Sequence, residues 1–437
     1  MKNPSIFSSK LASYPDTPKQ LGFLDKNYLS WQQGGIEQQL CLNDVVGTSL
    51  VNCGNENRAC LLISAYPKQQ AGLGGRKKRR VLREYYFTCT SLEERSQWQT
   101  AINNTLVGKA IDAAPQQRHL QIIINPNSGQ KKAARIFEQV RPLLDRSNLS
   151  YTVIETRSAN HTKEVTQQLD LATVNGLVII GGDGTIHDAI AGLMSHRDQE
   201  TAIKLPLGII PGGTGNGLCK SLLESVEEDY APLNAAFLIA KGRQQSFDLA
   251  FVDQGDNQYY SFLSLAWGLI SDVDIESEKL KFLGALRFDV YALILLAQLR
   301  TYRGKFSYLT HPSCQNFQSD ASTGDWQTIE DDFIFLWAMN TPWAAHDMNV
   351  TPHAKLNDGA IDVLVMRRGT PRIEILKALL RCGQGKHLDL PHMEYYKVSA
   401  FKLEPLAKEG ILVVDGEQVN YSKIEIEALP SLAAVNC

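Results

Sequence analysis

The sequence has 437 residues, of which 43% are hydrophobic, and it carries 44 lysines and arginines against 47 aspartates and glutamates. This length predicts two or three domains with ordinary apolar cores, and the net charge of −3 argues against a protein that binds nucleic acid in bulk. No run approaches the ~20 apolar residues of a membrane span, and the first residues lack the apolar core of a signal peptide. The eight cysteines show no C-x-x-C spacing, so reduced thiols in a cytoplasmic protein are expected.

Residues 20–110 are predicted to form a small β module at the front of the chain. Short alternating segments such as Tyr85–Cys89 are typical of antiparallel strands. The later segment Ser91–Glu94 is a capping box that predicts a helix start, and Trp98 lies on the apolar face of that helix. Several strands closed by one tryptophan-bearing helix resemble a pleckstrin-homology-like module, and Ala113–Gln117 is the expected linker to the next domain.

Five consecutive cations follow a glycine-rich turn inside this module. They are Arg76, Lys77, Lys78, Arg79 and Arg80. Near an anionic lipid surface each cation contributes about 1 kcal/mol, so peripheral association with a membrane is the first interpretation. A solvated loop and a nuclear address remain as alternatives, because basic clusters are common on protein surfaces.

Residues 117–247 contain three strand-to-helix turns rich in glycine and small polar residues. The apolar runs Leu120–Ile124, Asn175–Ile180 and Leu205–Ile210 are of the kind buried in a parallel sheet, and each precedes a helical repeat of apolar residues. The turns are Asn125–Gly129, Gly181–Thr185 and Pro211–Asn216. Because the carboxyl ends of parallel strands meet at one edge of a sheet, the turns are expected to lie together and to offer backbone N–H groups to phosphate oxygens.

Asp183 stands out in the second turn, because a carboxylate among phosphate-binding glycines repels an anion. It is therefore expected to accept a proton or to hold a metal, which points to phosphoryl transfer rather than nucleotide storage. The spacing of a Walker A loop is missing, and Gly212–Gly215 does not follow the dinucleotide-binding fingerprint. A single glycine turn often has no function beyond relieving backbone strain. The prediction of a phosphoryl-transfer site therefore depends on finding three such turns in one βαβ series.

Residues 248–430 change to many short strands, such as Phe333–Trp337 and Lys397–Leu403, which predicts an antiparallel β-sandwich. The expected fold class is therefore an α/β lobe with a parallel sheet, followed by a β-sandwich lobe and preceded by the small β module. Within the second lobe, the run Leu283–Leu299 is apolar over most of a helical surface. Such a helix either packs in a core or lines a lipid-binding tunnel.

Four motifs occur in order along the chain. They are N-P-N-S-G at 125–129, G-G-D-G-T at 181–185, P-G-G-T-G-N at 211–216 and D-G-E at 415–417. This order resembles the diacylglycerol-kinase-like lipid kinases. The runs S-L-A-W-G at 264–268, D-V-D-I-E-S-E-K at 272–279 and R-T-Y-R-G at 300–304 resemble sphingosine kinases more than ceramide or diacylglycerol kinases. The resemblance covers roughly residues 118–427.

The resemblance implies an ATP-dependent kinase that phosphorylates the primary hydroxyl of sphingosine or a related long-chain base, with ATP between the lobes and Mg²⁺ arriving with ATP. It assigns Asp183 as the general base and Asp274 to the ammonium and hydroxyls of the lipid head, which a carboxylate can bind through charge-assisted hydrogen bonds. The residues that it places near the substrate are Asp274, Asp183, Gly181, Gly182, Gly184 and Phe288.

The ATP contacts that the resemblance implies come from the four motifs and from neighbouring segments. They are Asn125, Pro126, Asn127, Thr156, Asn160, Gly182, Gly184, Asp188, Gly213, Thr214, Gly215, Lys281, Arg287, Asp415, Gly416 and Glu417. The family more often has arginine at Lys281 and glutamate at Asp188, so the detail of these two contacts differs. For Thr156 and Asn160, capping of the helix that begins near His161 is an alternative role.

Two other functions are compatible with the sequence. One is a kinase for another lipid, ceramide or diacylglycerol. The other is a catalytically dead, lipid-sensing membrane adaptor, against which the intact Asp183 and its glycines argue. The acidic residues near Asp274, namely Asp272, Glu276 and Glu278, can instead form a solvated surface with no role in binding. The nine histidines show no metal-binding spacing, so a metal site built by the protein alone is not expected.

Overall fold

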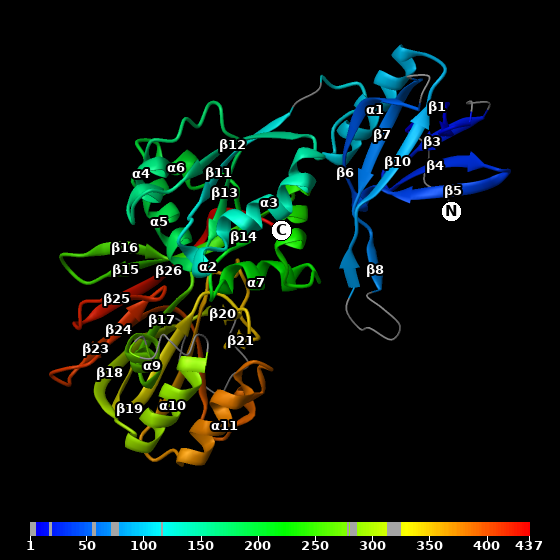
Figure 1. Cartoon of the computed structure of the whole chain (residues 1–437). Coiled ribbons are helices and arrows are strands. Elements are labelled where there is room, and N and C mark those ends of the chain that lie inside the picture. The colour runs from blue at the N-terminus through cyan, green and yellow to red at the C-terminus, as the bar shows by residue number, and fades with distance from the viewer. Residues whose placement is uncertain are drawn as a thin grey trace.

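The computed structural model describes residues 6–16, 20–54, 58–70, 78–114, 117–277, 279, 286–312 and 325–437. They form three parts, which we name the front module (residues 6–114), the α/β lobe (residues 118–243) and the sandwich lobe (residues 244–437) (Figure 1). The front module lies beside the α/β lobe, and the sandwich lobe extends from the other end of that lobe. A parallel α/β lobe followed by an antiparallel sandwich lobe confirms the predicted fold class.

Two four-stranded antiparallel sheets and one helix build the front module. Its elements are β1 (Phe7–Lys10), β2 (Ala12–Ser13), β3 (Leu21–Leu24), β4 (Tyr28–Gln33), β5 (Ile36–Cys41), β6 (Val45–Cys53), β7 (Arg58–Ala65), β8 (Lys68–Gln70), β9 (Lys78–Arg80), β10 (Arg83–Thr88) and α1 (Leu92–Leu106). The sheet orders are β1–β3–β4–β5 and β2–β10–β7–β6, and β8 pairs with β9 in a separate hairpin. Ser91 Oγ accepts the N–H of Glu94 at 3.1 Å, so the predicted cap of α1 is present, and Trp98 is buried under this helix.

Four parallel strands in the order β12–β11–β13–β14 form the centre of the α/β lobe. The elements are β11 (Arg118–Ile124), α2 (Ser128–Lys131), α3 (Ala133–Asp145), β12 (Leu149–Glu155), α4 (His161–Gln167), β13 (Gly176–Gly181), α5 (Asp183–Met194), α6 (Gln199–Ala202), β14 (Leu207–Pro211), α7 (Gly217–Ser225) and α8 (Pro232–Lys241). Strand β13 is buried along its whole length, as its continuous apolar sequence predicts. Helix α3 packs against α8 and α4 packs against α5, so two helix pairs cover the sheet.

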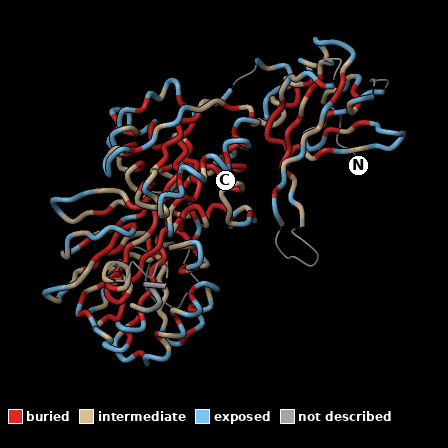
Figure 2. The backbone as a smooth tube through the Cα atoms, in the orientation of Figure 1, coloured by how far each residue is buried: buried red, intermediate tan, exposed pale blue. Residues whose placement is uncertain are grey.

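In its described residues, the sandwich lobe is a curled antiparallel sheet with three α-helices. Its elements are β15 (Gln244–Asp253), β16 (Gln258–Ser261), β17 (Ser264–Gly268), α9 (Leu269–Glu276), α10 (Leu286–Gln298), β18 (Tyr302–Thr310), β19 (Gln327–Met339), β20 (Trp343–Ala345), β21 (Met348–Asn349), β22 (Ile361–Arg367), α11 (Arg372–Cys382), β23 (Glu394–Pro405), β24 (Leu412–Val414), β25 (Glu417–Val419) and β26 (Ile424–Asn436). Trp267, Phe306 and Phe401 pack in one core of the sheet, and a second core lies beneath the helices. This division gives the sheet one face for its own core and one face for helices. Figure 2 shows that the strands of this lobe are mostly buried, whereas its outer loops are exposed.

Strand β26 joins the two lobes. It pairs with β23 in the sandwich lobe and with β15 along most of its length, and its Val435 also pairs in parallel with Leu207 of β14. Val435 and Phe247 of β15 belong to the same buried core as the α/β strands. The predicted boundary between residues 247 and 248 therefore falls inside a strand that both lobes share, and the two lobes are one continuous sheet rather than two linked bodies.

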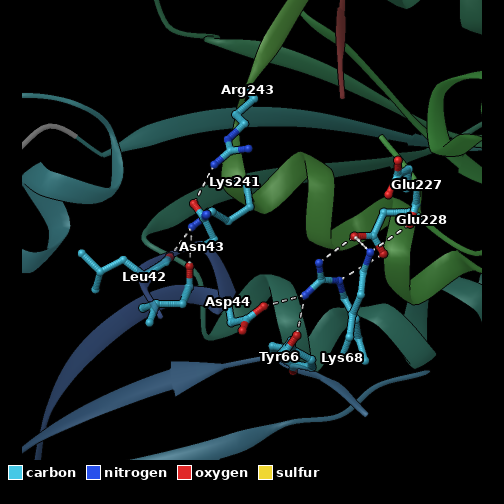
Figure 3. A network of polar contacts seen from close by, with 11 residues as sticks. Leu42, Asn43, Asp44, Tyr66, Lys68, Glu227, Glu228, Lys241 and Arg243 are labelled. Carbon is cyan, nitrogen blue, oxygen red and sulfur yellow. Dashed lines mark hydrogen bonds and ion pairs between the residues drawn. The ribbon is translucent and has the colours of Figure 1, made fainter. Parts of the chain in front are cut away.

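The front module is fixed to the α/β lobe by polar contacts that Figure 3 shows. Lys241 at the end of α8 donates to the carbonyl oxygens of Leu42 and Val45 at 2.9 and 2.8 Å. On the same surface, Val46 and Tyr66 of the module are buried in the core of the α/β lobe. These hydrogen bonds and the shared apolar core fix the module on the α/β lobe.

Arg80 requires a correction to the interpretation of the basic run. Its guanidinium donates to both carboxylate oxygens of Glu228 at 2.6 and 3.2 Å, and it stacks on the ring of Phe237, 3.6 Å from the centroid. It is only 7% exposed, because it lies between the module and the α/β lobe. Arg80 is therefore a buried interface residue and cannot face a membrane, whereas Arg79 is exposed. Arg76 and Lys77 lie outside the described residues, as does the side chain of Lys78.

Candidate active site

The three glycine turns meet at the carboxyl ends of β11, β13 and β14. A side chain on Gly129 would place its Cβ 2.0 Å from the carbonyl oxygen of Gly212, and one on Gly213 would place its Cβ 2.4 Å from Cα of Gly182. Contacts this short leave room only for hydrogen at these positions, so the glycines are required by the close approach of the three backbones. The turns are one structure, as the sequence predicts.

Asn125 holds the first turn against the second. Its Nδ2 donates to Thr185 Oγ1 at 3.0 Å, and its Oδ1 accepts the N–H of Asn127 at 3.1 Å. Pro126 lies between these residues, and α5 begins directly after Gly182. Free N–H groups at the start of a helix attract anions, so this edge of the sheet can receive phosphate groups. Thr214 of the third turn is exposed at the same edge.

Asp183 is the first residue of α5, and its two carboxylate oxygens have different surroundings. Oδ2 accepts the backbone N–H of Asn216 at 2.6 Å and that of Gly217 at 3.4 Å. Oδ1 is shielded from solvent and has no hydrogen-bond partner among the residues that the structure describes. Burial raises the pKa of Asp183 to about 6, against the effect of the two N–H donors. A carboxylate with one unpaired oxygen and a pKa near neutrality is suited to accept a proton.

Asn216 is a site residue to which the sequence analysis gave no role. Its backbone is left-handed, with φ of 57°. Its Nδ2 donates to the carbonyl of Gly181 at 2.9 Å, and its Oδ1 accepts the N–H of Gly213 at 2.9 Å, while its own N–H donates to Asp183. Asparagine tolerates this conformation better than most residues, so an asparagine directly after a glycine turn is the signal that could have identified it.

Replacing Asn216 tests how much the turn depends on its side chain. Asn216→Gly keeps the left-handed backbone but removes two buried hydrogen bonds, which we expect to destabilise the protein by about 2–3 kcal/mol. Asn216→Ala should cost about 1 kcal/mol more, because alanine is strained at this φ. Thermal denaturation and turnover of both variants measure this difference. Equal stability of Asn216→Ala and the natural protein would contradict the assignment.

The D-G-E motif forms the turn of a β-hairpin. Asp415 and Gly416 have φ of 51° and 86°, and Val414 pairs with Glu417 across the turn, as in the two-residue hairpins that favour Asp-Gly. The Asp415 carboxylate is buried and accepts hydrogen bonds from Ser261 Oγ and from backbone N–H groups of residues 262–264, at 2.7–3.1 Å. Glu417 is exposed, and its Oε1 lies 3.5 Å from the Cβ position of Gly184. The hairpin therefore places one carboxylate of the sandwich lobe beside the second glycine turn.

His187, which the sequence analysis also missed, connects α5 to this hairpin. Its Nδ1 lies 3.0 Å from Asp415 Oδ2, and its ring contacts Tyr259 edge to face. Burial disfavours the imidazolium, but the hydrogen bond and charge of Asp415 outweigh burial, so the pKa of His187 lies above its usual value. No local pattern in the sequence marks this pair, because 228 positions separate the two residues.

The remaining implied ATP contacts in the α/β lobe lie around the same edge. Thr156 is buried after β12, and its N–H donates to the carbonyl of Ile124 at 2.9 Å. Asn160 is exposed at the start of α4 and makes no side-chain capping bond, so the capping role expected as its alternative is absent. Burial raises the pKa of Asp188, and the charge of Glu417 raises it further while His187 lowers it.

Outside the glycine turns, the implied lipid contacts are Asp274 of α9 and Phe288 of α10. Helix α9 follows β17 and packs back over β17 and β19, and Asp274 is half-buried in its last turn. Asp272 is 3% exposed and bonded to the hydroxyl of Tyr302, so its interpretation as part of a solvated face is wrong. Lys281 lies outside the described residues, and for Arg287 and Phe288 the structure describes the backbone of α10 alone.

An apolar cavity of about 20 Å³ lies between α11 and strands β19 and β22, with one residue of α9 in its wall. Ile270 of α9, Trp337 of β19 and Ile375 of α11 are among the residues that line it. Among the described residues there is no group of three or more histidine, cysteine, aspartate or glutamate side chains that could hold a metal ion, and no helix is long and apolar enough to cross a membrane.

Comparison with known proteins agrees with this geometry. Residues 119–252 match the diacylglycerol kinase catalytic domain, and residues 268–437 match the YegS C-terminal NAD kinase beta sandwich-like domain. The solved structure of a Bacillus anthracis str. Sterne protein described as a diacylglycerol kinase superposes with a TM-score of 0.56 at 22% identity, over 74% of this chain and 97% of that one. This likeness concerns the fold alone.

Curated relatives are more similar in sequence. Sphingosine kinase 1 of Arabidopsis thaliana is 34% identical over 76% of this chain and 74% of its own length. Sphingosine kinase 2 of the same plant is 32% identical over 89% of this chain and 85% of its own. Sphingosine kinase 1 of Homo sapiens is 32% identical over 72% of this chain and 90% of its own.

Proposed function

Because the chain belongs to the sphingosine kinases of the diacylglycerol-kinase-like lipid kinase family, we propose that it transfers the γ-phosphoryl group of ATP to the primary hydroxyl of sphingosine or a related long-chain base. The observation that carries this proposal is Asp183, with one paired and one unpaired buried oxygen at the meeting point of three glycine turns. The product would be the 1-phosphate of the base.

In the proposed reaction, the oxygen of the primary alcohol attacks the γ-phosphorus of ATP. A P–O bond forms to the lipid, the bond to the β-phosphate oxygen breaks, and ADP leaves with that electron pair. Asp183 Oδ1 accepts the alcohol proton, while Asp183 Oδ2 stays bonded to the backbone of Asn216 and Gly217. Most of the rate enhancement in such transfers comes from positioning and charge stabilisation, which the rigid turns support.

The glycine turns are proposed to receive the phosphates of ATP, because α5 begins directly after Gly182 and the first N–H groups of a helix attract anions. Mg²⁺ bound with ATP would neutralise phosphate charge, and it commonly takes only one or two protein carboxylates beside water and phosphate oxygens. Glu417 from the sandwich lobe and Asp188 from α5 are the proposed flanking contacts to the nucleotide.

The lipid is proposed to bind in the sandwich lobe. The Asp274 carboxylate would bind the ammonium and hydroxyls of the head through charge-assisted hydrogen bonds. We propose that the alkyl chain binds among the apolar side chains that line the small cavity beside Ile270, which would have to widen to admit it, because burial is favourable at roughly 0.8 kcal/mol per CH₂ group. An amide-linked lipid such as ceramide has no ammonium for Asp274, which favours the free base over that alternative.

Peripheral membrane contact is the proposed role of the exposed part of the basic run. Among its side chains that the structure describes, Arg79 alone is exposed, since Arg80 is committed to Glu228. Sedimentation with anionic vesicles measures this contribution when Arg79→Met is compared with the natural protein. Unchanged binding would remove Arg79 from the proposed membrane surface.

A lipid panel tests the proposed substrate. With labelled ATP and equal amounts of sphingosine, sphinganine, ceramide and diacylglycerol, we expect phosphorylation of the two free bases. Asp274→Asn should raise KM for the base by about 10- to 100-fold, because it removes a charge-assisted bond, and should leave KM for ATP within about twofold. Preference for ceramide or diacylglycerol would refute the proposed substrate. Binding without turnover of any lipid would favour the adaptor.

A further inference from the structure

We propose that His187 is a positioning residue of the phosphoryl-transfer site, which fastens the D-G-E hairpin of the sandwich lobe to α5 and thereby holds Glu417 beside the glycine turns. The proposal rests on the kinase function proposed above. It concerns a contact between α5 and the D-G-E hairpin at the place where ATP would bind.

The bonds to Asp415 show what His187 adds. Oδ1 accepts from Ser261 Oγ at 2.7 Å and from the N–H groups of Leu263 and Ser264 at 2.9 and 3.0 Å. Oδ2 accepts from the N–H of Phe262 at 3.1 Å and faces His187 Nδ1 at 3.0 Å. Four of the five partners belong to the sandwich lobe itself and fix the turn within that lobe. His187 is the one partner in this set that comes from the α/β lobe.

The charges around the hairpin explain why such a fastening is needed. Glu417 stands two residues after Asp415, and its carboxylate lies near the start of α5, a helix that carries Asp183 as its first residue and Asp188 about one and a half turns later. Like charges at this distance repel, as the effect of Glu417 on the pKa of Asp188 shows. The hydrogen bond from His187 to the buried Asp415 carboxylate opposes that repulsion.

The tight turn of the hairpin links the position of Asp415 to that of Glu417. Asp415 and Gly416 form a two-residue turn in left-handed backbone, and Val414 pairs directly with Glu417. Such a turn has little freedom, so fixing the Asp415 carboxylate also fixes the start of β25. When His187 is lost, the hairpin keeps its four bonds within the sandwich lobe, so it should stay folded. Its contact with α5 is lost, and we therefore expect Glu417 to move relative to the glycine turns.

Two substitutions of His187 test the proposal in the full-length protein. His187→Asn keeps an N–H donor near the place of Nδ1, whereas His187→Leu removes it. We expect His187→Leu to weaken the binding of Mg·ATP, measured by titration calorimetry without lipid, and to lower kcat/KM for ATP by about 10- to 100-fold. His187→Asn should stay within about fivefold of the natural protein, and KM for sphingosine should change less than about twofold in both.

His392→Leu is the matched control, because His392 also pairs with a carboxylate, that of Glu374, on the outside of the sandwich lobe. It should bind Mg·ATP like the natural protein. Normal Mg·ATP affinity and turnover in His187→Leu would overturn the proposal, and so would a lower melting temperature with unchanged Mg·ATP affinity. Failure of the natural protein to phosphorylate any lipid would refute the proposed function instead, while the calorimetric comparison would still decide the role of His187.

Discussion

Replacing Asp183 with asparagine is expected to lower turnover by about 10²–10⁴-fold, the usual contribution of a general base. Asparagine keeps an oxygen for the N–H groups of Asn216 and Gly217, so the turn should persist. It cannot accept the proton of the alcohol. Steady-state kinetics with sphingosine and ATP measure the loss, and Asp256→Asn, an exposed change of the same charge, should behave as the natural protein. Near-normal turnover of Asp183→Asn would exclude it as the base.

The same carboxylate predicts a pH dependence of both activity and stability. Because the pKa of Asp183 is raised to about 6, kcat/KM should rise with pH through about 6, as the carboxylate ionises. The folded protein binds the proton of Asp183 more tightly than the unfolded chain does, so protonation of Asp183 stabilises the fold. This stabilisation is fully present below pH 3.8, the ordinary pKa of an aspartate, and is lost as the pH rises through about 6.

Asp183→Asn should not show this loss of stability at higher pH, because asparagine does not titrate. Between pH 4 and pH 7, the natural protein should lose about 2–3 kcal/mol of unfolding free energy relative to the variant, since one pKa unit corresponds to ~1.4 kcal/mol. Denaturant titrations at both pH values measure the shift. A constant difference would mean that the folded protein does not raise the pKa of Asp183.

The parts of this molecule that the sequence predicts are those with a local signal. Strand β13 is apolar along its whole length because it is covered on both sides, and its turn is glycine-rich because neighbouring backbones approach within van der Waals contact. Asp415-Gly416 is a standard pair for a tight hairpin turn. Each of these patterns can be recognised without knowing which residue lies opposite.

The residues that the sequence did not reveal have partners far along the chain. Arg80 and Arg79 are adjacent cations in one basic run, yet one is buried and the other exposed. What separates them is Glu228, which lies 148 positions away. His187 likewise gains its role from Asp415. Burial of a charge depends on where its counter-charge folds, and no spacing rule for a single segment contains that information.

The second large effect is expected at the interface of the front module. Arg80→Met should lower the free energy of unfolding by about 2–4 kcal/mol, because it leaves Glu228 buried without its main partner. Lys68 still lies 2.9 Å from Glu228, so the cost should stay slightly below the ~3–5 kcal/mol typical of a broken buried pair. Arg79→Met is the matched control, and its effect should be below about 0.5 kcal/mol because that side chain is exposed.

A double-mutant cycle separates loss of the ion pair from loss of packing. Methionine can keep the contact with the ring of Phe237 that the guanidinium now makes. The variant that combines Arg80→Met with Glu228→Leu should therefore be more stable than either single variant, because it removes both buried charges of the pair. Lys68 and Asp44 lose a partner in this variant, but both side chains are partly exposed and can be solvated. Additive costs would show that the two side chains do not act as a pair.

Hydrogen exchange locates the consequence of losing Arg80. If the ion pair holds the module on the α/β lobe, the backbone amides of β6 should exchange faster in Arg80→Met, because Val46 in this strand is buried against that lobe. Strand β13, which lies in the centre of the lobe, should keep its protection. Faster exchange in both strands would indicate general destabilisation, and unchanged exchange in β6 would mean that Lys241 and its two carbonyl contacts suffice to hold the module. Faster exchange in β6 alone would establish that Arg80, one cation of the basic run, helps to hold the front module on the α/β lobe.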